Sequence, residues 1–188
     1  MKIYFIRHPE TLWNKKGLFQ GIKESGLSQA GYFTTGNFIE ESKKIKINSI
    51  YYADNNRCKY LVDKLLKIHT ESNAKRDIRL NERSFGEYEG FPEKDIAKVT
   101  FFNPEDFMKK FIWKPPGGES LKDVLPRVKD FLSDIKKVEK RSNVVFVITS
   151  GGVIRVASII LGLKTLREAM VYKTKKLEIV EVNMGEVS

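Results

Sequence analysis

The chain has a single cysteine, Cys58, so its 188 residues cannot form an internal disulfide. A protein without disulfides fits a reducing compartment, and we therefore expect a cytoplasmic location. No apolar stretch approaches the ~20 residues that are needed to cross a bilayer. The N-terminus has neither a long apolar segment nor a small-residue cleavage site. The sequence therefore predicts no signal peptide and no membrane partner.

Internal repeats, low-complexity tracts and Gly/Ser-rich linkers are also missing from the sequence. Its length, with 41 % apolar and 31 % charged residues, suits an ordinary globular protein. We therefore expect residues 1–188 to form a single domain. Whether that domain forms a homodimer stays open.

Acidic residues are the minority among the charged ones, with 24 Asp and Glu against 34 Lys and Arg, and the formal net charge is +10. Such an excess can attract nucleic acid, anionic lipid or small phosphorylated molecules. The chain has no zinc-finger spacing and no aromatic RNA-binding motif, and its lysines alternate with acids as on a solvated surface. Nucleic acid is therefore the least favoured partner.

Apolar periodicity predicts strands that alternate with helices. The expected strands are Lys2–Ile6, Asn48–Ala53, Asp77–Leu80, Asn143–Thr149 and Leu177–Val182. The expected helices are 28–43, 55–68, 121–135 and 151–161, with loop and short helices over 85–116. Pro126 predicts either a kink in the third helix or a helix that begins near residue 125. This alternation predicts an α/β fold, a three-layer αβα sandwich around a mostly parallel sheet.

Polar residues follow three of the predicted strands. Arg7 and His8 follow the first, residues 54–57 the second, and Ser150-Gly151-Gly152 the strand that ends at Thr149. Taken singly, each has an ordinary explanation as a surface pair, a solvated cation or a tight turn. Ligands of such sheets bind outside the carboxyl ends of the strands. The joint occurrence at three strand ends therefore predicts a ligand site.

The segment Arg7-His8-Pro9-Glu10-Thr11 begins an ordered series of short motifs. The later motifs are Trp13-Asn14, Gln20-Gly21, Leu27–Gly31, Ala53–Cys58, Leu80–Gly90 and Gly117–Ser120. Together they resemble the histidine phosphatase superfamily, which includes the cofactor-dependent phosphoglycerate mutases and has glycine where this chain has Pro9. The resemblance covers roughly residues 2–182 and implies a phosphoglycerate mutase-like α/β fold.

The resemblance also implies roles for the matched residues. His8 would be the nucleophile that forms a phosphohistidine. Arg7 and Arg57 would bind the phosphoryl oxygens, and Glu82 would be the general acid for the leaving oxygen. The further phosphate-binding or pocket residues would be Asn14, Gln20, Gly21 and Gly151. No metal and no cofactor is implied.

Two positions depart from the family pattern. The family's second histidine normally begins a His-Gly-Gly turn, and this chain has Ser150 there; a frequent arginine between Asn14 and Gly21 is also absent. Losing one hydrogen-bond donor to the transition state, as when this histidine is absent, costs about 2.7–4 kcal/mol, or roughly 10²–10³ in rate. A serine hydroxyl and the Gly151 and Gly152 amides can still donate, so Ser150 stays a candidate catalytic residue. A weak phosphatase, a pseudoenzyme and a site mutated to trap a complex all remain open.

The leading prediction is a phosphomonoester phosphatase that acts through phospho-His8 on a small phosphate ester. A phosphoglycerate mutase is the alternative within the same chemistry. A mutase needs a lid that excludes water, and the segment between Gly90 and Pro116 is short, which favours a hydrolase. The alternative from another class is a non-catalytic protein that binds phosphate esters through Arg7 and Arg57.

Overall fold

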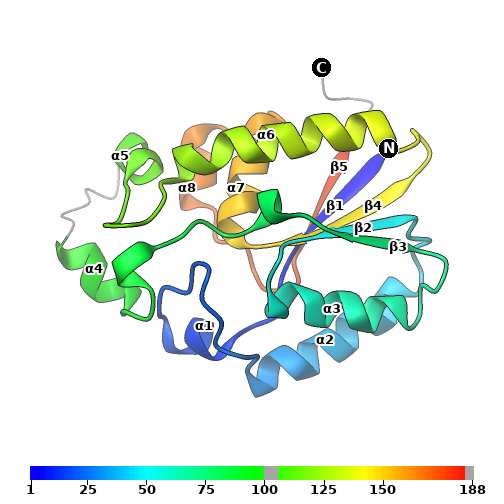
Figure 1. Cartoon of the computed structure of the whole chain (residues 1–188), viewed down its shortest axis with the longest axis horizontal. Helices are drawn as coiled ribbons and strands as arrows, with labels where there is room; N and C mark the ends of the chain where they lie inside the picture. The colour runs from blue at the N-terminus through cyan, green and yellow to red at the C-terminus, as the bar shows by residue number, and fades with distance from the viewer. Residues whose placement is uncertain (100–105, 185–188) are drawn as a thin grey trace.

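A five-stranded sheet forms the centre of the computed structural model, which describes residues 1–99 and 106–184 (Figure 1). The strand order is β3-β2-β4-β1-β5. The strands are β1 (Lys2–Arg7), β2 (Ser49–Tyr52), β3 (Asn73–Arg76), β4 (Val144–Thr149) and β5 (Ile179–Asn183). Only β5 runs antiparallel to its neighbour β1, so this part of the chain has the mostly parallel sheet that was predicted.

Helices cover both faces of the sheet (Figure 1). On one face lie α2 (Gln29–Ser42) and α3 (Asn56–Leu66), and on the other α6 (Leu121–Val138), α7 (Gly151–Ile160) and α8 (Leu166–Val171). The short helices are α1 (Leu12–Lys16), η1 (Ile78–Leu80), η2 (Gly86–Tyr88), α4 (Glu93–Val99) and α5 (Phe107–Ile112). The predicted three-layer α/β fold is confirmed. Within the described ranges, no helix has the length and apolar character that a bilayer crossing requires.

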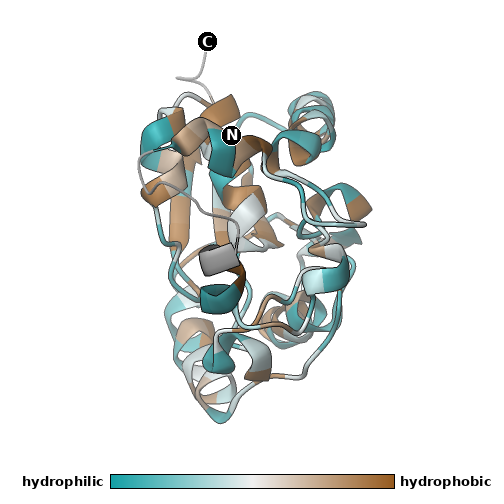
Figure 2. Cartoon of the chain, turned by 90° about the vertical axis from the view of Figure 1, so that its left-hand side faces the viewer, coloured by the Kyte–Doolittle hydropathy of each residue, from teal (hydrophilic) through white to brown (hydrophobic). Residues whose placement is uncertain are grey.

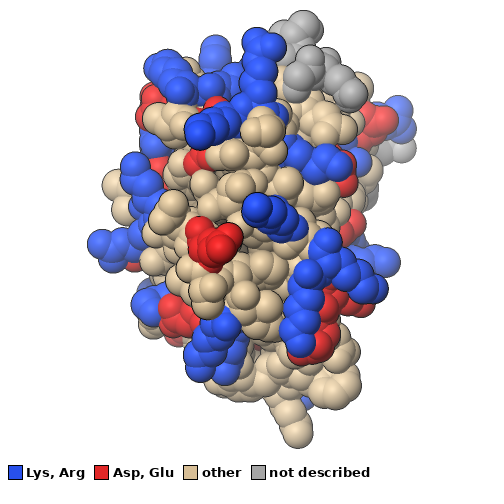
Figure 3. Space-filling model, turned by 90° about the vertical axis from the view of Figure 1, so that its right-hand side faces the viewer, with Lys and Arg blue, Asp and Glu red and all other residues tan. Residues whose placement is uncertain are grey.

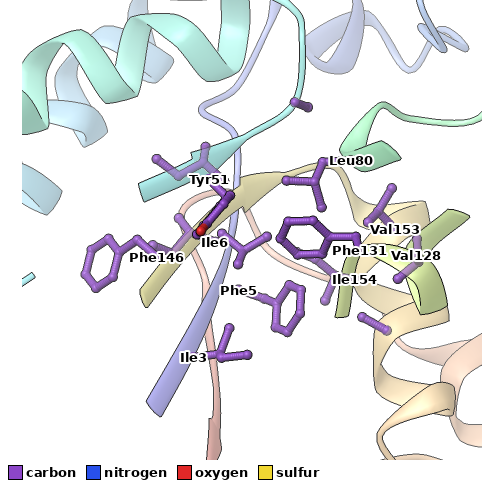
Figure 4. Close-up of a cluster of buried hydrophobic side chains, with 14 of the residues drawn as sticks. Ile3, Phe5, Ile6, Tyr51, Leu80, Val128, Phe131, Phe146, Val153 and Ile154 are labelled. Atoms are coloured by element: carbon purple, nitrogen blue, oxygen red, sulfur yellow. The ribbon is translucent and has the colours of Figure 1, made fainter. Parts of the chain in front are cut away.

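Hydrophobic residues, coloured brown, lie along the strands and on parts of the helices (Figure 2), and the buried ones form one core cluster. Residues 145–148 of β4 are completely buried, as expected for a strand that is covered on both faces. Phe131 of α6 belongs to the same cluster as Phe5 and Ile6 of β1 (Figure 4). This core holds the strands rigidly, so the residues that follow them have fixed positions.

Helix α6 begins at Leu121 because Ser120 caps it. The Ser120 Oγ accepts a hydrogen bond from the Asp123 N–H (3.1 Å), and the Asp123 carboxylate accepts one from the Ser120 N–H (3.0 Å). This reciprocal pair is a capping box. Pro126 lies inside the helix, so the alternative start near residue 125 is wrong.

Replacing Ser120 with alanine should lower the free energy of unfolding by about 1 kcal/mol, because the Asp123 amide loses its acceptor. Ser133→Ala is the matched control, since Ser133 is exposed in the middle of the same helix. That control should change the free energy of unfolding by only a few tenths of a kcal/mol. Urea unfolding followed by circular dichroism measures both, and equal changes would contradict the capping role.

Two predicted strand positions are wrong. The segment predicted as a strand over Asp77–Leu80 contains η1, because the Asp77 Oδ1 accepts a hydrogen bond from the Arg79 N–H (2.9 Å) and turns the chain. The strand is instead β3, whose residues are all exposed. It lies at the edge of the sheet and therefore carries no apolar pattern. The last strand begins at Ile179 rather than at Leu177, because Leu177 has a φ of +58°.

Candidate active site

The sheet brings the ends of three parallel strands to one edge. Arg7 of β1 pairs with Thr149 of β4, and Ile148 pairs with Tyr52 of β2. A cleft of about 440 Å³ lies beside these strand ends. Eight of the nine predicted site residues line it, namely Arg7, His8, Asn14, Gln20, Gly21, Arg57, Glu82 and Gly151. Strand order thus assembles residues that are far apart in the sequence.

The imidazole of His8 is held as a neutral ring. Its Nδ1 lies 2.7 Å from the Pro9 carbonyl oxygen. Because a carbonyl only accepts, Nδ1 carries the proton and Nε2 keeps a free lone pair. Burial holds the pKa of His8 well below its usual 6.5, and the nearby Arg57 and Arg7 lower it further. His8 therefore has the protonation state of a nucleophile at neutral pH.

Two arginines are positioned by backbone carbonyls. Arg7 donates from Nη1 to the Thr174 carbonyl (2.6 Å), and its guanidinium lies against Gly151. Arg57 is only 3 % exposed and donates to the carbonyls of Gly21 (2.6 Å) and Lys23 (3.0 Å).

These contacts leave hydrogen-bonding capacity on both guanidinium groups. The Glu24 carboxylate lies 3.7 Å from Arg57 Nη1. In the described part of the chain, the Nε atoms of Arg7 and Arg57 are buried without a hydrogen-bond partner. Each guanidinium can therefore offer a buried N–H to an anion in the cleft.

The carboxyl group of Glu82 is fixed by two backbone amides. Its Oε1 accepts from the Arg83 N–H (2.8 Å) and its Oε2 from the Gly152 N–H (3.1 Å). A Cβ on residue 152 would lie 2.2 Å from Oε1, so only glycine leaves room for this carboxyl. The second glycine of the Ser-Gly-Gly turn therefore positions Glu82 in the same cleft as His8.

The loop that holds Arg57 is braced by the predicted residue Gln20 and by Glu89, which was not predicted as a site residue. The Gln20 Oε1 accepts from the Thr11 hydroxyl (2.6 Å), and its Nε2 donates to the Lys23 carbonyl (3.1 Å). The buried Glu89 carboxylate accepts from the amides of Ile22 (3.1 Å) and Phe85 (3.0 Å). These contacts hold residues 20–23 against the segment that follows Glu82.

Asn14 and Gly21 each have a local structural role as well. The Asn14 Oδ1 accepts from the Thr11 N–H (3.4 Å) in the cap of α1. Gly21 has a φ of +56°, and a Cβ there would lie 2.1 Å from the Glu89 Oε1. Glycine at this position therefore allows the turn whose carbonyl holds Arg57.

Ser150 directly precedes Gly151, which lines the cleft, but Ser150 itself is not among the described residues that line it. It is 1 % exposed and is the N-cap residue of α7, although its side chain makes no capping hydrogen bond in the described part of the chain. Its Oγ has no hydrogen-bond partner within residues 1–99 and 106–184. The catalytic role of Ser150 stays a prediction.

Four cationic residues of the cleft were missed by sequence analysis: Arg83, Arg155, Lys173 and Lys176. Arg83 directly follows Glu82, and Arg155 lies one helical turn after Gly152 (residues three apart share a helix face), so proximity and helical periodicity could have indicated both. The two lysines come from the connection between α8 and β5. Its sequence carries no motif that places it at the cleft.

The two additional arginines remain charged although they are buried or partly buried. The Arg83 Cζ lies 4.4 Å from the centroid of the Phe85 ring and 5.3 Å from that of the Trp113 ring. Burial lowers the pKa of Arg83 to about 10. Arg155 donates from Nε to the Tyr172 carbonyl (3.0 Å), and burial lowers its pKa too. Within the described residues, no group of three His, Cys, Asp or Glu side chains forms a metal site.

Comparison with known proteins identifies the family. The model of the histidine phosphatase superfamily (branch 1) matches residues 3–186. The chain belongs to this superfamily. "Putative phosphoserine phosphatase 2" of Hydrogenobacter thermophilus is 31 % identical over 139 residues, which are 72 % of this chain and 66 % of the relative. The chain thus spans slightly less than two thirds of that relative.

A second relative matches over a longer stretch. It is a 2,3-bisphosphoglycerate-dependent phosphoglycerate mutase of Brucella melitensis, 29 % identical over 184 residues, which are 91 % of this chain and 85 % of the mutase. The first of these two relatives is thus named as a phosphatase and the second as a mutase.

Two solved structures have the same fold as this chain. A mycobacterial glucosyl-3-phosphoglycerate phosphatase superposes with a TM-score of 0.84 at 21 % identity, covering 96 % of this chain and 91 % of that one. The alpha-ribazole phosphatase of Shigella flexneri gives 0.81 at 18 % identity, covering 96 % and 89 %. At these identities the likeness shows the fold. The predicted membership of the histidine phosphatase superfamily is confirmed.

Proposed function

We propose that the chain is a phosphomonoester phosphatase that acts through a phosphohistidine at His8. The neutral imidazole of His8 carries the proposal, because its protonated Nδ1 is bound to the Pro9 carbonyl and its Nε2 keeps the lone pair that can attack phosphorus. The Nε–H groups of Arg7 and Arg57 support it, because they have no partner among the described residues and guanidinium groups suit phosphoryl oxygens.

The proposed reaction has two steps. In the first, His8 Nε2 attacks phosphorus, the bond from phosphorus to the ester oxygen breaks, and that oxygen takes a proton from Glu82. In the second, water attacks the phosphohistidine, the Glu82 carboxylate accepts the water proton, and phosphate leaves with His8 again neutral. Arg7 and Arg57 stabilise the charge on the phosphoryl oxygens in both steps.

The charges of the cleft support a substrate with a second anionic group. Six basic side chains line the cleft against the carboxylates of Glu82 and Glu93. Because Arg7 and Arg57 are proposed to bind the phosphoryl group, Arg83 and Arg155 remain for another negative group. We therefore propose a small phosphate ester that carries a carboxylate or a further phosphate.

The net charge of +10 is compatible with this substrate without invoking nucleic acid. On the face in Figure 3, lysine and arginine side chains are spread out and several stand beside acids. The basic groups that serve the proposed function are those that line the cleft, and a small phosphate ester is the proposed partner.

Phosphoglycerate mutase activity is the second candidate, favoured by the likeness to the mutase of Brucella melitensis. It uses the same phosphohistidine but returns the phosphoryl group to a sugar-acid hydroxyl instead of to water. Incubation with 3-phosphoglycerate and its bisphosphorylated primer separates the two functions. Release of inorganic phosphate supports the phosphatase, and exchange of phosphate between positions without release supports the mutase.

The direct test is to trap the intermediate. The protein is mixed with ³²P-labelled p-nitrophenyl phosphate, quenched within milliseconds in alkali and digested. We expect label on the peptide that contains residue 8, stable to alkali and labile to acid, as a phosphoramidate is. Label on another residue would overturn the proposal. Binding of vanadate, the ion in a neighbour's structure, without turnover would favour the non-catalytic alternative.

A further inference from the structure

The connection between α8 and β5 is bound to Arg7 on both sides. The Thr174 carbonyl accepts from Arg7 Nη1 (2.6 Å), and the Leu177 N–H donates to the Arg7 carbonyl (3.0 Å). The Arg7 N–H donates to the Glu178 carbonyl (3.4 Å). Residues 174–178 are therefore fixed beside the residue that precedes His8.

This fixed backbone places two adjacent lysines in different surroundings. Lys176 is half-buried and lines the cleft with His8 and Glu82, whereas Lys175 is exposed. Leu177 has a φ of +58°, the only positive φ of a non-glycine residue in the described chain. Such strain persists only where the surrounding structure enforces it, and it is frequent at functional sites. The strained turn therefore presents Lys176 to the cleft.

The ammonium group of Lys176 is available to a ligand. Within residues 1–99 and 106–184, neither a hydrogen bond nor an ion pair ties it to a protein partner. The charged or titratable groups that act on it electrostatically come from β1 and the residues after it, from the segment after η1 and from α4; they are Arg7, His8, Glu10, Glu82 and Glu93. Burial, with a smaller contribution from Arg7, lowers the pKa of Lys176 to about 7, although the three carboxylates raise it.

We propose that the Lys176 ammonium donates a hydrogen bond to a non-bridging oxygen of the phosphoryl group while that group is transferred to and from His8. The family pattern has a second histidine at the position of Ser150, and that histidine would supply a cationic donor. Ser150 has a neutral, buried hydroxyl instead, and Lys176 would supply the cationic donor in its place. The step transfers no proton, because Lys176 stays protonated throughout. The inference rests on the proposed function.

The test compares two adjacent lysines. Lys176→Met should lower kcat for p-nitrophenyl phosphate about 100-fold, the usual effect of losing one donor to developing charge. Lys175→Met is the matched control and should keep the wild-type kcat, since its side chain is exposed outside the cleft. Circular dichroism confirms that both variants are folded.

A pH profile separates a catalytic role from a structural one. In the wild type, kcat/KM should fall as pH rises through about 7, because Lys176 loses its proton there. Lys176→Arg keeps a permanent charge, so its kcat/KM should persist to higher pH. The ionisation of the substrate phosphate, near pH 6, is common to both proteins and cancels in the comparison.

The outcomes distinguish the two proposals. If His8→Asn is as active as the wild type, the proposed function fails. If His8→Asn is inactive while Lys176→Met matches Lys175→Met, the proposed function stands and the role of Lys176 fails. An alkaline limb that is the same in the wild type and in Lys176→Arg would also overturn the role of Lys176, even if Lys176→Met did not fold.

Discussion

His8→Asn should lower kcat/KM for p-nitrophenyl phosphate by about 10⁴-fold or more, the scale of losses when a covalent nucleophile is removed. Asparagine is close to histidine in size and polarity but has no lone pair that can form a stable phosphoramidate. The loss of the trapped intermediate should accompany the loss of rate. Initial rates of phosphate release and the ³²P trap measure the two effects on the same samples.

The matched control is His69→Asn. The other histidine of the chain accepts or donates a hydrogen bond at 3.1 Å from the Ser42 Oγ, and it does not line the cleft. Its replacement should leave kcat/KM within about twofold of the wild type, as for a substitution away from the site. Equal losses in the two variants would contradict the nucleophile assignment.

The pH dependence at the acid side follows from the same residue. Attack requires the neutral imidazole, and protonation of Nε2 removes the lone pair. Burial and the two arginines hold the pKa of His8 well below 6.5, so acidification should abolish activity only well below that pH. Because Lys176 loses its proton near pH 7, we expect the optimum on the acid side of neutrality.

Glu82→Gln should show the second-largest effect, and its size should depend on the leaving group. With an alkyl ester such as phosphoserine, kcat/KM should fall about 10³-fold, because a poor leaving group needs the proton from Glu82. With p-nitrophenyl phosphate the loss should stay below about tenfold, since nitrophenolate leaves without protonation. The ratio kcat/KM is the right measure because it reports the phosphorylation step.

Two further variants sharpen this test. Glu93→Gln removes the other carboxylate of the cleft and should leave the ratio between the two substrates unchanged. Gly152→Ala should reproduce the leaving-group dependence, because the new Cβ would lie 2.2 Å from Oε1 and displace the Glu82 carboxyl. A loss in Glu82→Gln that is equal for both substrates would exclude Glu82 as the general acid.

Much of the fold was predictable from local pattern. The buried run over β4 and the apolar stripe of α6 are strong signals, because both elements bury continuous apolar surface. Eight predicted residues line one cleft because parallel strands present their carboxyl ends at the same edge. The edge strand β3 was mislocated for the opposite reason, since an exposed polar strand has no apolar periodicity.

From sequence alone, the buried strands, the amphipathic helices and the residues at the ends of those strands could be predicted, because apolar periodicity and chain order act locally. Tertiary structure alone decided the protonation state of His8, which depends on burial beside two cations from separate elements. It also decided that Lys176 lies in the cleft while Lys175 lies outside it. Desolvation and long-range contacts set these properties, and they arise only once distant segments pack together.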